Sequence, residues 1–250
     1  MAVGRRSRRR QHSPRQRMRV LVTGGGGFIG SHTVDALLAA GDEVSVLDDF
    51  SSGQRANLAP HAKLRIIAGD IRDPAAVQQA MTGITHVMHL AAQVFVPASI
   101  AEPVHSASIN VTGFLNVLDA ARRVQVKRFV YASSAAVYGI PERLPVDEAS
   151  LVMPLSPYGL EKAINDRYGA LFKDLYGIST LGLRYFNVYG PRQDPRSAYS
   201  GVISKFADCA RANQPVTVFG DGLQTRDFIY VGDVACANVA ALRGGGRTVS

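Results

Sequence analysis

The sequence predicts an α/β protein built on a doubly wound parallel sheet. Short β-branched runs alternate with longer amphipathic segments, and a run of four glycines joins the first of each. The 250 residues are 46% hydrophobic, enough to bury a substantial core. Strands that alternate with helices form parallel sheets covered on both faces, because right-handed crossovers return the chain to the same sheet edge.

The expected elements follow in chain order. We expect strands at 19–23, 43–48, 63–69, 86–92, 128–134 and 179–185, and helices at 28–40, 74–83, 104–124 and 158–176. After residue 185 the pattern is less regular, with helices expected near 201–212 and 233–242 and a strand at 215–220. The chain therefore divides into a basic tail (1–17), a nucleotide-binding domain (18–185) and part of a smaller substrate lobe (186–250), which we expect to be truncated.

The net charge of +8 is concentrated at the N-terminus. Residues 1–19 hold eight arginines and no acidic residue, which leaves 20 basic and 20 acidic residues elsewhere. We expect a disordered, dispensable tail, with strand patterning starting at Met18; a targeting or polyanion-binding role is the alternative. A neutral body without an apolar run of eighteen residues predicts a cytoplasmic protein with no specific nucleic-acid partner and no membrane span. Cys209 and Cys236 lack metal-ligand spacing and are expected to be buried free thiols, so no metal site is predicted.

The stretch VLVTGGGGFIGSH, residues 20–32, lies between the first expected strand and the first expected helix. Gly24, Gly27 and Gly30 fit a phosphate-binding turn of the Rossmann type, as do Gly25, Gly27 and Gly30. Asp48 follows near the end of the second strand, where a carboxylate can bind the adenosine ribose and would repel a 2′-phosphate. The pattern predicts a Rossmann domain that binds NAD rather than NADP. An aspartate that only caps a loop is the alternative, and it suits Asp49 better than Asp48.

The segment SPYGLEKA places Tyr158 and Lys162 four residues apart on an expected helix. They should lie about 40° apart around the axis and roughly 6 Å along it, on one face. A tyrosine with an ordinary pKa of about 10 can act as a base near pH 7 only if its phenolate is favoured by roughly 4 kcal/mol. The Lys162 ammonium and a positively charged nicotinamide ring can supply that together.

A strand that ends in Ser133 and Ser134 brings hydroxyl groups to the carboxyl edge of the sheet, where ligands gather in such folds. Ser134 is the candidate to hydrogen-bond a substrate oxygen beside Tyr158. A serine that caps the following loop is the alternative, and Ser133 fits that role as well or better.

Seven segments in this order resemble the extended short-chain dehydrogenase/reductase superfamily: TGGGGFIGSH, GDI, HLAA, SSAAVYG, SPYGLEK, LRYFNVYGPRQ and QTRDFIYVGDV. Within it the chain is most similar to NAD-dependent nucleotide-sugar epimerases of the UDP-glucose 4-epimerase type. The resemblance implies catalysis by Ser134, Tyr158 and Lys162. It implies NAD contacts from Gly24, Gly27, Phe28, Ile29, Gly30, Asp48, Asp49, Asp70, Ile71, Leu90, Ala91, Ala92, Asn110, Tyr158, Lys162 and Tyr185. Asn110 would also support the active site, and Asn187 and Arg226 would contact the diphosphate of a nucleotide-diphosphate sugar.

The resemblance further implies epimerisation through a transient 4-keto sugar and a homodimeric enzyme. Tyr158 would take the proton of the sugar 4-hydroxyl while tightly held NAD accepts the hydride, and rotation of the ketone before its return inverts C4. The alternative role for Arg226 is a structural ion pair with Asp227 or with another carboxylate of the protein.

The chain departs from related enzymes at two places. Dehydratases and decarboxylases of the superfamily carry an acidic residue where this chain has Ala135 and Ala136, which favours epimerisation or reduction over those alternatives. Some 4-epimerases carry a lysine after HLAA, whereas this chain has Gln93, Val94 and Phe95. A Rossmann protein that senses NAD without catalysis remains a further alternative, although it would be expected to lose Tyr158, Lys162 or the third glycine.

Overall fold

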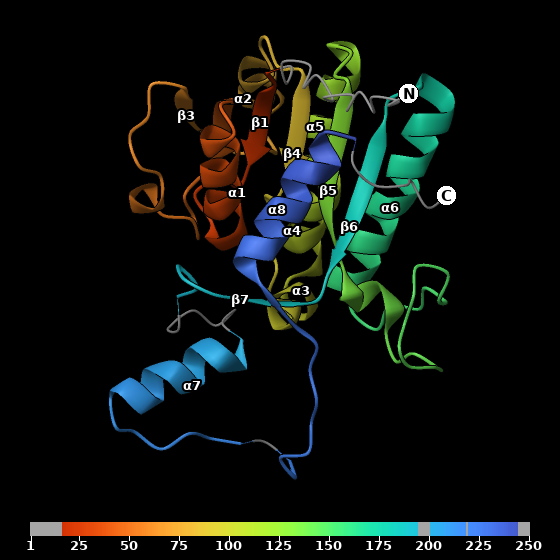
Figure 1. The fold of residues 1–250 in the computed structure, drawn as a ribbon. Coiled ribbons are helices and arrows are strands. Elements are labelled where there is room, and N and C mark those ends of the chain that lie inside the picture. Colours follow the sequence, from red (N-terminus) through yellow and green to blue (C-terminus); the bar gives the residue numbers. More distant parts are fainter. Residues whose placement is uncertain (1–16, 195–200, 219, 245–250) are drawn as a thin grey trace, which may run out of the picture.

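In the computed structural model, which describes residues 17–194, 201–218 and 220–244, six strands form one parallel sheet in the order β3-β2-β1-β4-β5-β6 (Figure 1). The strands are β1 (Arg19–Thr23), β2 (Glu43–Asp48), β3 (Leu64–Ala68), β4 (His86–His89), β5 (Arg128–Ser134) and β6 (Thr180–Tyr185). The helices are α1 (Phe28–Ala39), α2 (Pro74–Ala80), α3 (Val96–Ala101), α4 (Pro103–Ala107), α5 (Phe114–Arg123), α6 (Pro157–Tyr176), α7 (Val202–Arg211) and α8 (Val231–Leu242). The doubly wound parallel sheet expected from the alternating pattern is confirmed.

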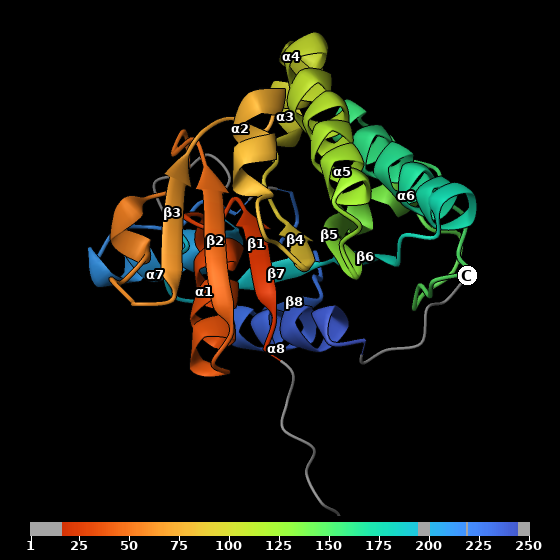
Figure 2. The ribbon, with the colours of Figure 1, turned by 90° about the horizontal axis from the view of Figure 1, so that it is seen from above.

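Helices cover both faces of the sheet (Figure 2). Because side chains alternate along a strand, Val20 and Val22 of β1 point to one face and Leu21 to the other. The first face packs against α1 and α8, and the second against α2, α5 and α6. The two apolar cores fix the register of each strand, since a slip by one residue would exchange the faces.

Strands β1, β4 and β5 lie next to one another in the sheet and run parallel. Their carboxyl ends therefore meet at one edge. Residues 24–27 follow β1, residues 90–95 follow β4 and residues 135–138 follow β5. A parallel sheet collects its ligand-binding loops at this edge. The fold thus places the glycine run and the serine pair at the same edge of the sheet, with the loop after β4 between them.

The long helix expected at 104–124 is interrupted. It consists of α4, a π-helical turn (Ser108–Gly113) and α5. A continuous α-helix and a helix with one π-helical turn have nearly the same apolar periodicity. The extra residue in the π-helical turn was therefore not visible in the sequence. The turn brings Asn110 into the protein interior, where only 2% of it is exposed.

The irregular region after β6 differs from expectation in detail. Residues 215–218 and 220 form no strand, although PVTVFG is rich in β-branched residues. A parallel pair forms instead between β7 (Asn187–Tyr189) and β8 (Phe228–Tyr230), two segments for which we expected no strand. Helix α3 was not expected either. Strand formation needs a hydrogen-bonding partner, which short segments reveal poorly.

Helices α7 and α8 occupy different surroundings. Helix α7 stands apart from the sheet and has no buried residue, whereas α8 crosses the face of the sheet beside α1 (Figure 1). Asn238 of α8 donates to Thr33 Oγ1 of α1 at 2.9 Å. The division at residue 185 stays a prediction, and most of the tail lies outside the described residues.

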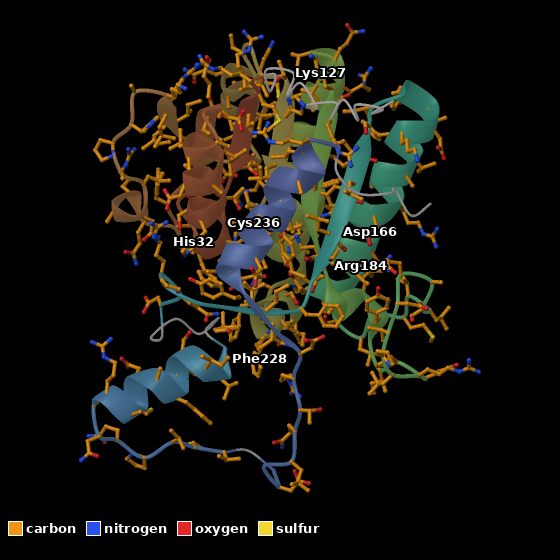
Figure 3. All side chains as sticks on the ribbon, in the orientation of Figure 1. His32, Lys127, Asp166, Arg184, Phe228 and Cys236 are labelled. Carbon is orange, nitrogen blue, oxygen red and sulfur yellow. The ribbon has the colours of Figure 1, made fainter. Side chains whose placement is uncertain are left out.

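The cysteines are less buried than we expected. Cys209 on α7 is half-buried, and Cys236 is exposed on the outer side of α8 (Figure 3). Small thiols pack in cores only when the helix turns them inward, and Cys236 lies on the other side of α8. Within the described ranges no helix has the length and hydrophobicity of a membrane span, and no His, Cys, Asp and Glu side chains group as metal ligands do.

Candidate functional site

The glycine turn between β1 and α1 is closely packed by backbone. Gly24 has a positive φ of 70° and donates its N–H to Leu47 O at 2.9 Å. A Cβ at Gly24 would lie 2.7 Å from the Ala91 nitrogen, and one at Gly30 would lie 2.0 Å from Gly24 O. Side chains at these positions would displace the backbone, so the turn requires glycine for both conformation and space.

The first turn of α1 is open to a ligand. Its N-cap is Gly27, which provides no side-chain cap, and no acidic residue lies in the first turn. The unpaired N–H groups of Phe28 and Ile29 and the helix dipole favour an anion there. The turn therefore presents N–H donors and a partial positive charge that suit the pyrophosphate of a dinucleotide.

Asp48 lies directly beside this turn, at the end of β2. Its Oδ2 accepts the Gly26 N–H and its Oδ1 accepts the Phe50 N–H, each at 2.8 Å. Burial raises the Asp48 pKa, and the two backbone hydrogen bonds lower it. The carboxylate keeps lone pairs for ribose hydroxyls, and its negative charge disfavours a 2′-phosphate.

The neighbouring acidic residues are engaged with the protein. Asp49 Oδ1 accepts the Ser51 N–H and hydroxyl, which is the loop-capping role considered for it. Asp70 forms an ion pair with Arg72, whose guanidinium lowers the Asp70 pKa. Ile71 is buried in the core against Gly113, so it can offer a ligand only its backbone.

The loop after β4 is attached to β1 through Thr23. The Thr23 hydroxyl hydrogen-bonds His89 Nδ1 at 2.9 Å and accepts the N–H groups of Leu90 and Ala91 at 3.2 Å. Burial lowers the pKa of His89 to about 3, so the imidazole stays neutral. Thr23 and His89 were not singled out from the sequence, because a lone threonine or histidine in a strand carries no distinguishing pattern.

Tyr158 and Lys162 lie side by side on α6, which begins at Pro157 after the N-cap Ser156. The Lys162 ammonium lies 5.7 Å from the centroid of the Tyr158 ring and donates to Ala132 O at 3.0 Å. Ser134 lies at the end of β5 and hydrogen-bonds the Tyr158 side chain. The structure thus brings all three predicted catalytic residues together.

The loop-capping alternative, which fitted Ser133 as well or better, applies to Ser134, which also lies beside Tyr158. Ser134, rather than Ser133, caps the following loop, because its Oγ accepts the Ala136 N–H at 3.1 Å. The Ser133 hydroxyl turns to the opposite face of the strand and donates to Asp166 of α6 at 3.1 Å. Asp166 also pairs with Arg184 of β6 at 3.2 Å (Figure 3).

Burial controls the charges of the catalytic pair. Desolvation lowers the pKa of Lys162 from 10.5 to about 8, although the carboxylates of Asp166 and Glu161 raise it. Desolvation also raises the pKa of Tyr158, while the hydrogen bond with Ser134 lowers it. The protein alone therefore keeps Tyr158 protonated at neutral pH, and its activation needs a further positive charge at the site.

Three buried polar residues that the sequence did not single out lie on α6 or against it: Ser99, Ser106 and Glu161. The Ser99 hydroxyl of α3 accepts the Tyr158 N–H at 3.2 Å, which caps the catalytic helix from another segment. Ser106 and Asn110 both donate to Glu161, the residue before Lys162. A glutamate preceding a lysine on a helix is common on surfaces, so only its 4% exposure reveals it.

The remaining predicted residues lie at the margin. Asn187 donates to the Asp227 carbonyl between β7 and β8, and Arg226 is exposed and donates to Thr225 O. Tyr185 points to the α8 side of the sheet, where its hydroxyl donates to Asn238 at 2.6 Å. Its hydroxyl is committed to this contact.

A glycine turn at a helix N-terminus, an acidic residue on β2 and a Tyr-Lys pair beside Ser134 define a dinucleotide-dependent enzyme of the Rossmann class. Comparison with known proteins identifies the family. The profile of the NAD dependent epimerase/dehydratase family matches residues 20–249, and the chain belongs to this family.

Named relatives share most of the chain. A putative UDP-glucose 4-epimerase of Methanocaldococcus jannaschii is 48% identical over 89% of this chain and 73% of its own length. The structure of a UDP-N-acetylglucosamine 4-epimerase from Methanobrevibacter ruminantium, in complex with UDP-N-acetylmuramic acid, superposes with a TM-score of 0.87 at 40% identity. That match covers 91% of this chain and 73% of the other. The Thermus thermophilus UDP-glucose 4-epimerase complex with NAD gives 0.84 at 43% identity, covering 90% and 74%.

Replacing Asp48 with alanine should weaken NAD binding about tenfold or more and reduce discrimination against NADP. The variant loses the ribose acceptor and the charge that repels a 2′-phosphate. Fluorescence titration with both cofactors measures the two affinities, and Asp174→Ala, at an exposed position on α6, serves as the control. Equal affinity of the unchanged protein for NAD and NADP would contradict this assignment.

Replacing Lys162 with methionine should stabilise the cofactor-free protein at pH 7. Since the folded-state pKa is about 8 against an ordinary 10.5, charging the ammonium costs the folded state up to roughly 3 kcal/mol. The cost is fully present below pH 8. It shrinks as the pH rises towards 10.5, because the folded state releases the proton first.

Melting temperatures of both proteins between pH 7 and 10 test this linkage. The variant should melt higher at pH 7, and the difference should narrow as the pH rises. A variant that melts lower at every pH would show that the Lys162 contacts outweigh its burial.

Proposed function

We propose that this protein is an NAD-dependent nucleotide-sugar 4-epimerase that acts on UDP-glucose, UDP-galactose or a closely related UDP-sugar. The observation that carries the proposal is the placement of Tyr158, Lys162 and Ser134 at the same sheet edge as the glycine turn. Relatives whose names specify UDP-glucose or UDP-N-acetylglucosamine 4-epimerases support the substrate class.

The chain supplies binding, orientation and proton transfer. Gly24 and Gly30 allow the close backbone packing that forms the turn at the N-terminus of α1, where a pyrophosphate would bind, and Asp48 would hold the adenosine ribose. When bound, NAD supplies a reversible two-electron acceptor and a positive ring charge. Lys162 would hydrogen-bond the adjoining ribose and would add a second positive charge near Tyr158.

Tyr158 removes and returns the proton of the sugar 4-hydroxyl. Ser134 hydrogen-bonds the same sugar oxygen and so holds it within reach of Tyr158. The sugar passes through a 4-keto form, and return of hydrogen to its opposite face inverts C4. Ala135 and Ala136 offer no acid or base, which favours this reaction over dehydration or decarboxylation.

Asn187 and Arg226 complete the proposal at the substrate diphosphate. Both side chains lie beside the β7–β8 pair and are exposed. The Arg226 guanidinium can form two parallel hydrogen bonds with phosphate oxygens. A cytoplasmic location also belongs to the proposal, and fractionation of expressing cells tests it.

Tyr158→Phe should retain bound NAD and lose turnover by about a thousandfold or more. The variant keeps the ring and the helix but removes the group assigned as base. Lys162→Ala should lose both bound NAD and turnover. Absorbance of NAD released by denaturation and epimerase rates on UDP-sugars measure the two properties, and near-normal turnover by Tyr158→Phe would refute the mechanism.

We also propose a homodimer that pairs α6 of two copies. Leu160, Leu171 and Leu175 are 52%, 49% and 68% exposed, and they fall within about 60° around the helix. Such an apolar stripe favours association. Leu171→Glu should shift the mass measured by light scattering towards the monomer, whereas Asp174→Ala should not; a monomeric unchanged protein would contradict the proposal.

A further inference from the structure

Glu161 carries a buried carboxylate next to the catalytic pair. It is 4% exposed and precedes Lys162 on α6. Its Oε2 accepts the Ser106 hydroxyl at 2.8 Å and the Asn110 side-chain amide at 2.6 Å. Burial of a carboxylate is costly, and removing an acceptor leaves its buried donors unsatisfied.

Asn110 connects this carboxylate to the loop after β4. Its Nδ2 also donates to Gln93 O at 2.8 Å, and its Oδ1 accepts the Gln93 N–H at 2.9 Å. The amide therefore bonds both backbone groups of Gln93 and the carboxylate at once. Only one orientation of the amide satisfies all three contacts, because a carboxylate cannot donate to Oδ1.

The connected loop and helix hold different parts of the site. Residues 91–93 continue from the strand beside the glycine turn, where Ala91 contacts Gly24. Glu161 lies between Tyr158 and Lys162 in the sequence of α6, and Ser99 attaches α3 to the same helix at Tyr158. The hydrogen bonds from Glu161 through Asn110 to Gln93 thus cross from the catalytic helix to the cofactor side.

We propose that Glu161 is a positioning residue that orients Asn110 and thereby fixes the loop at Gln93 relative to Tyr158 and Lys162. The inference rests on the proposed function for its effect on turnover, but its structural part is independent of the reaction. Glu161 acts through Asn110 and touches neither sugar nor cofactor. The property it needs is an acceptor oxygen at this position, and a glutamine can supply that oxygen without charge.

Hydrogen exchange at Gln93 tests the structural part without any substrate. In the full chain, Glu161→Ala should make peptides covering residues 90–95 exchange about tenfold faster, since Asn110 loses the contact that orients it. Glu161→Gln should stay within about threefold of the unchanged protein. Asp174→Ala, an exposed acidic residue on the same helix, is the matched control, and peptides covering residues 19–23 should not change in any variant.

Turnover provides the second measurement. Glu161→Ala should lower kcat about tenfold to a hundredfold with KM within threefold, while Glu161→Gln restores most of kcat. Unchanged exchange at residues 90–95 in Glu161→Ala, or glutamine as damaging as alanine, would overturn the inference. Altered exchange in a chain without epimerase activity would refute the proposed function and leave the inference standing.

Exchanging the two side chains covers the case in which Glu161→Ala does not fold. Asn110→Asp places two carboxylates in contact and should speed exchange at residues 90–95 and lower kcat. Adding Glu161→Gln removes this repulsion and lets the new amide donate to the carboxylate at position 110, but the Gln93 carbonyl still lacks its donor. A partial recovery of about twofold or more is therefore expected in both measurements. The absence of recovery would show that the pair does not act as a unit.

Discussion

The close approach of the β1–α1 turn to its neighbours is the constraint on which the site depends. Gly24 bonds Leu47 of β2 and leaves no space for a Cβ against Ala91 after β4. The ends of β1, β2 and β4 are therefore in direct contact, and the N-terminus of α1 lies next to them. Asp48 and the loop after β4 are positioned by the same contact, since both pack on the turn.

The catalytic helix carries charge into the protein interior. Lys162 is 2% exposed, and burial pulls its pKa down to about 8 while two nearby carboxylates oppose that fall. The same burial raises the pKa of Tyr158, which disfavours the phenolate that a base requires. Such an arrangement costs stability and is useful only when a ligand completes the balance of charge, as is common for functional sites.

Membership in the epimerase/dehydratase family limits the set of reactions that the chain can be expected to catalyse. Sequence differences from related enzymes near the site limit this set further. The family fold serves several reactions on nucleotide sugars, so the site residues must distinguish them. Ala135 and Ala136 stand where the resemblance implies an acidic residue in dehydratases, and Gln93, Val94 and Phe95 stand where it implies a lysine in some 4-epimerases. The buried contacts of Gln93 give that position a structural role in this chain.

The sequence by itself determined the alternation of strands with helices along the chain, the glycine turn and the Tyr-Lys pair. Each of these features depends on local periodicity or on a short spacing between residues. It could not determine the π-helical turn at Asn110 or the β7–β8 pair, since these depend on segments far away in the chain, nor which serine caps the loop after β5, since that depends on how the end of the strand orients each hydroxyl. Glu161 is the clearest case. The local sequence around Glu161 is typical of an exposed helix surface. Only the packing of α3, α4 and the π-helical turn against α6 buries this residue and gives it hydrogen-bond donors.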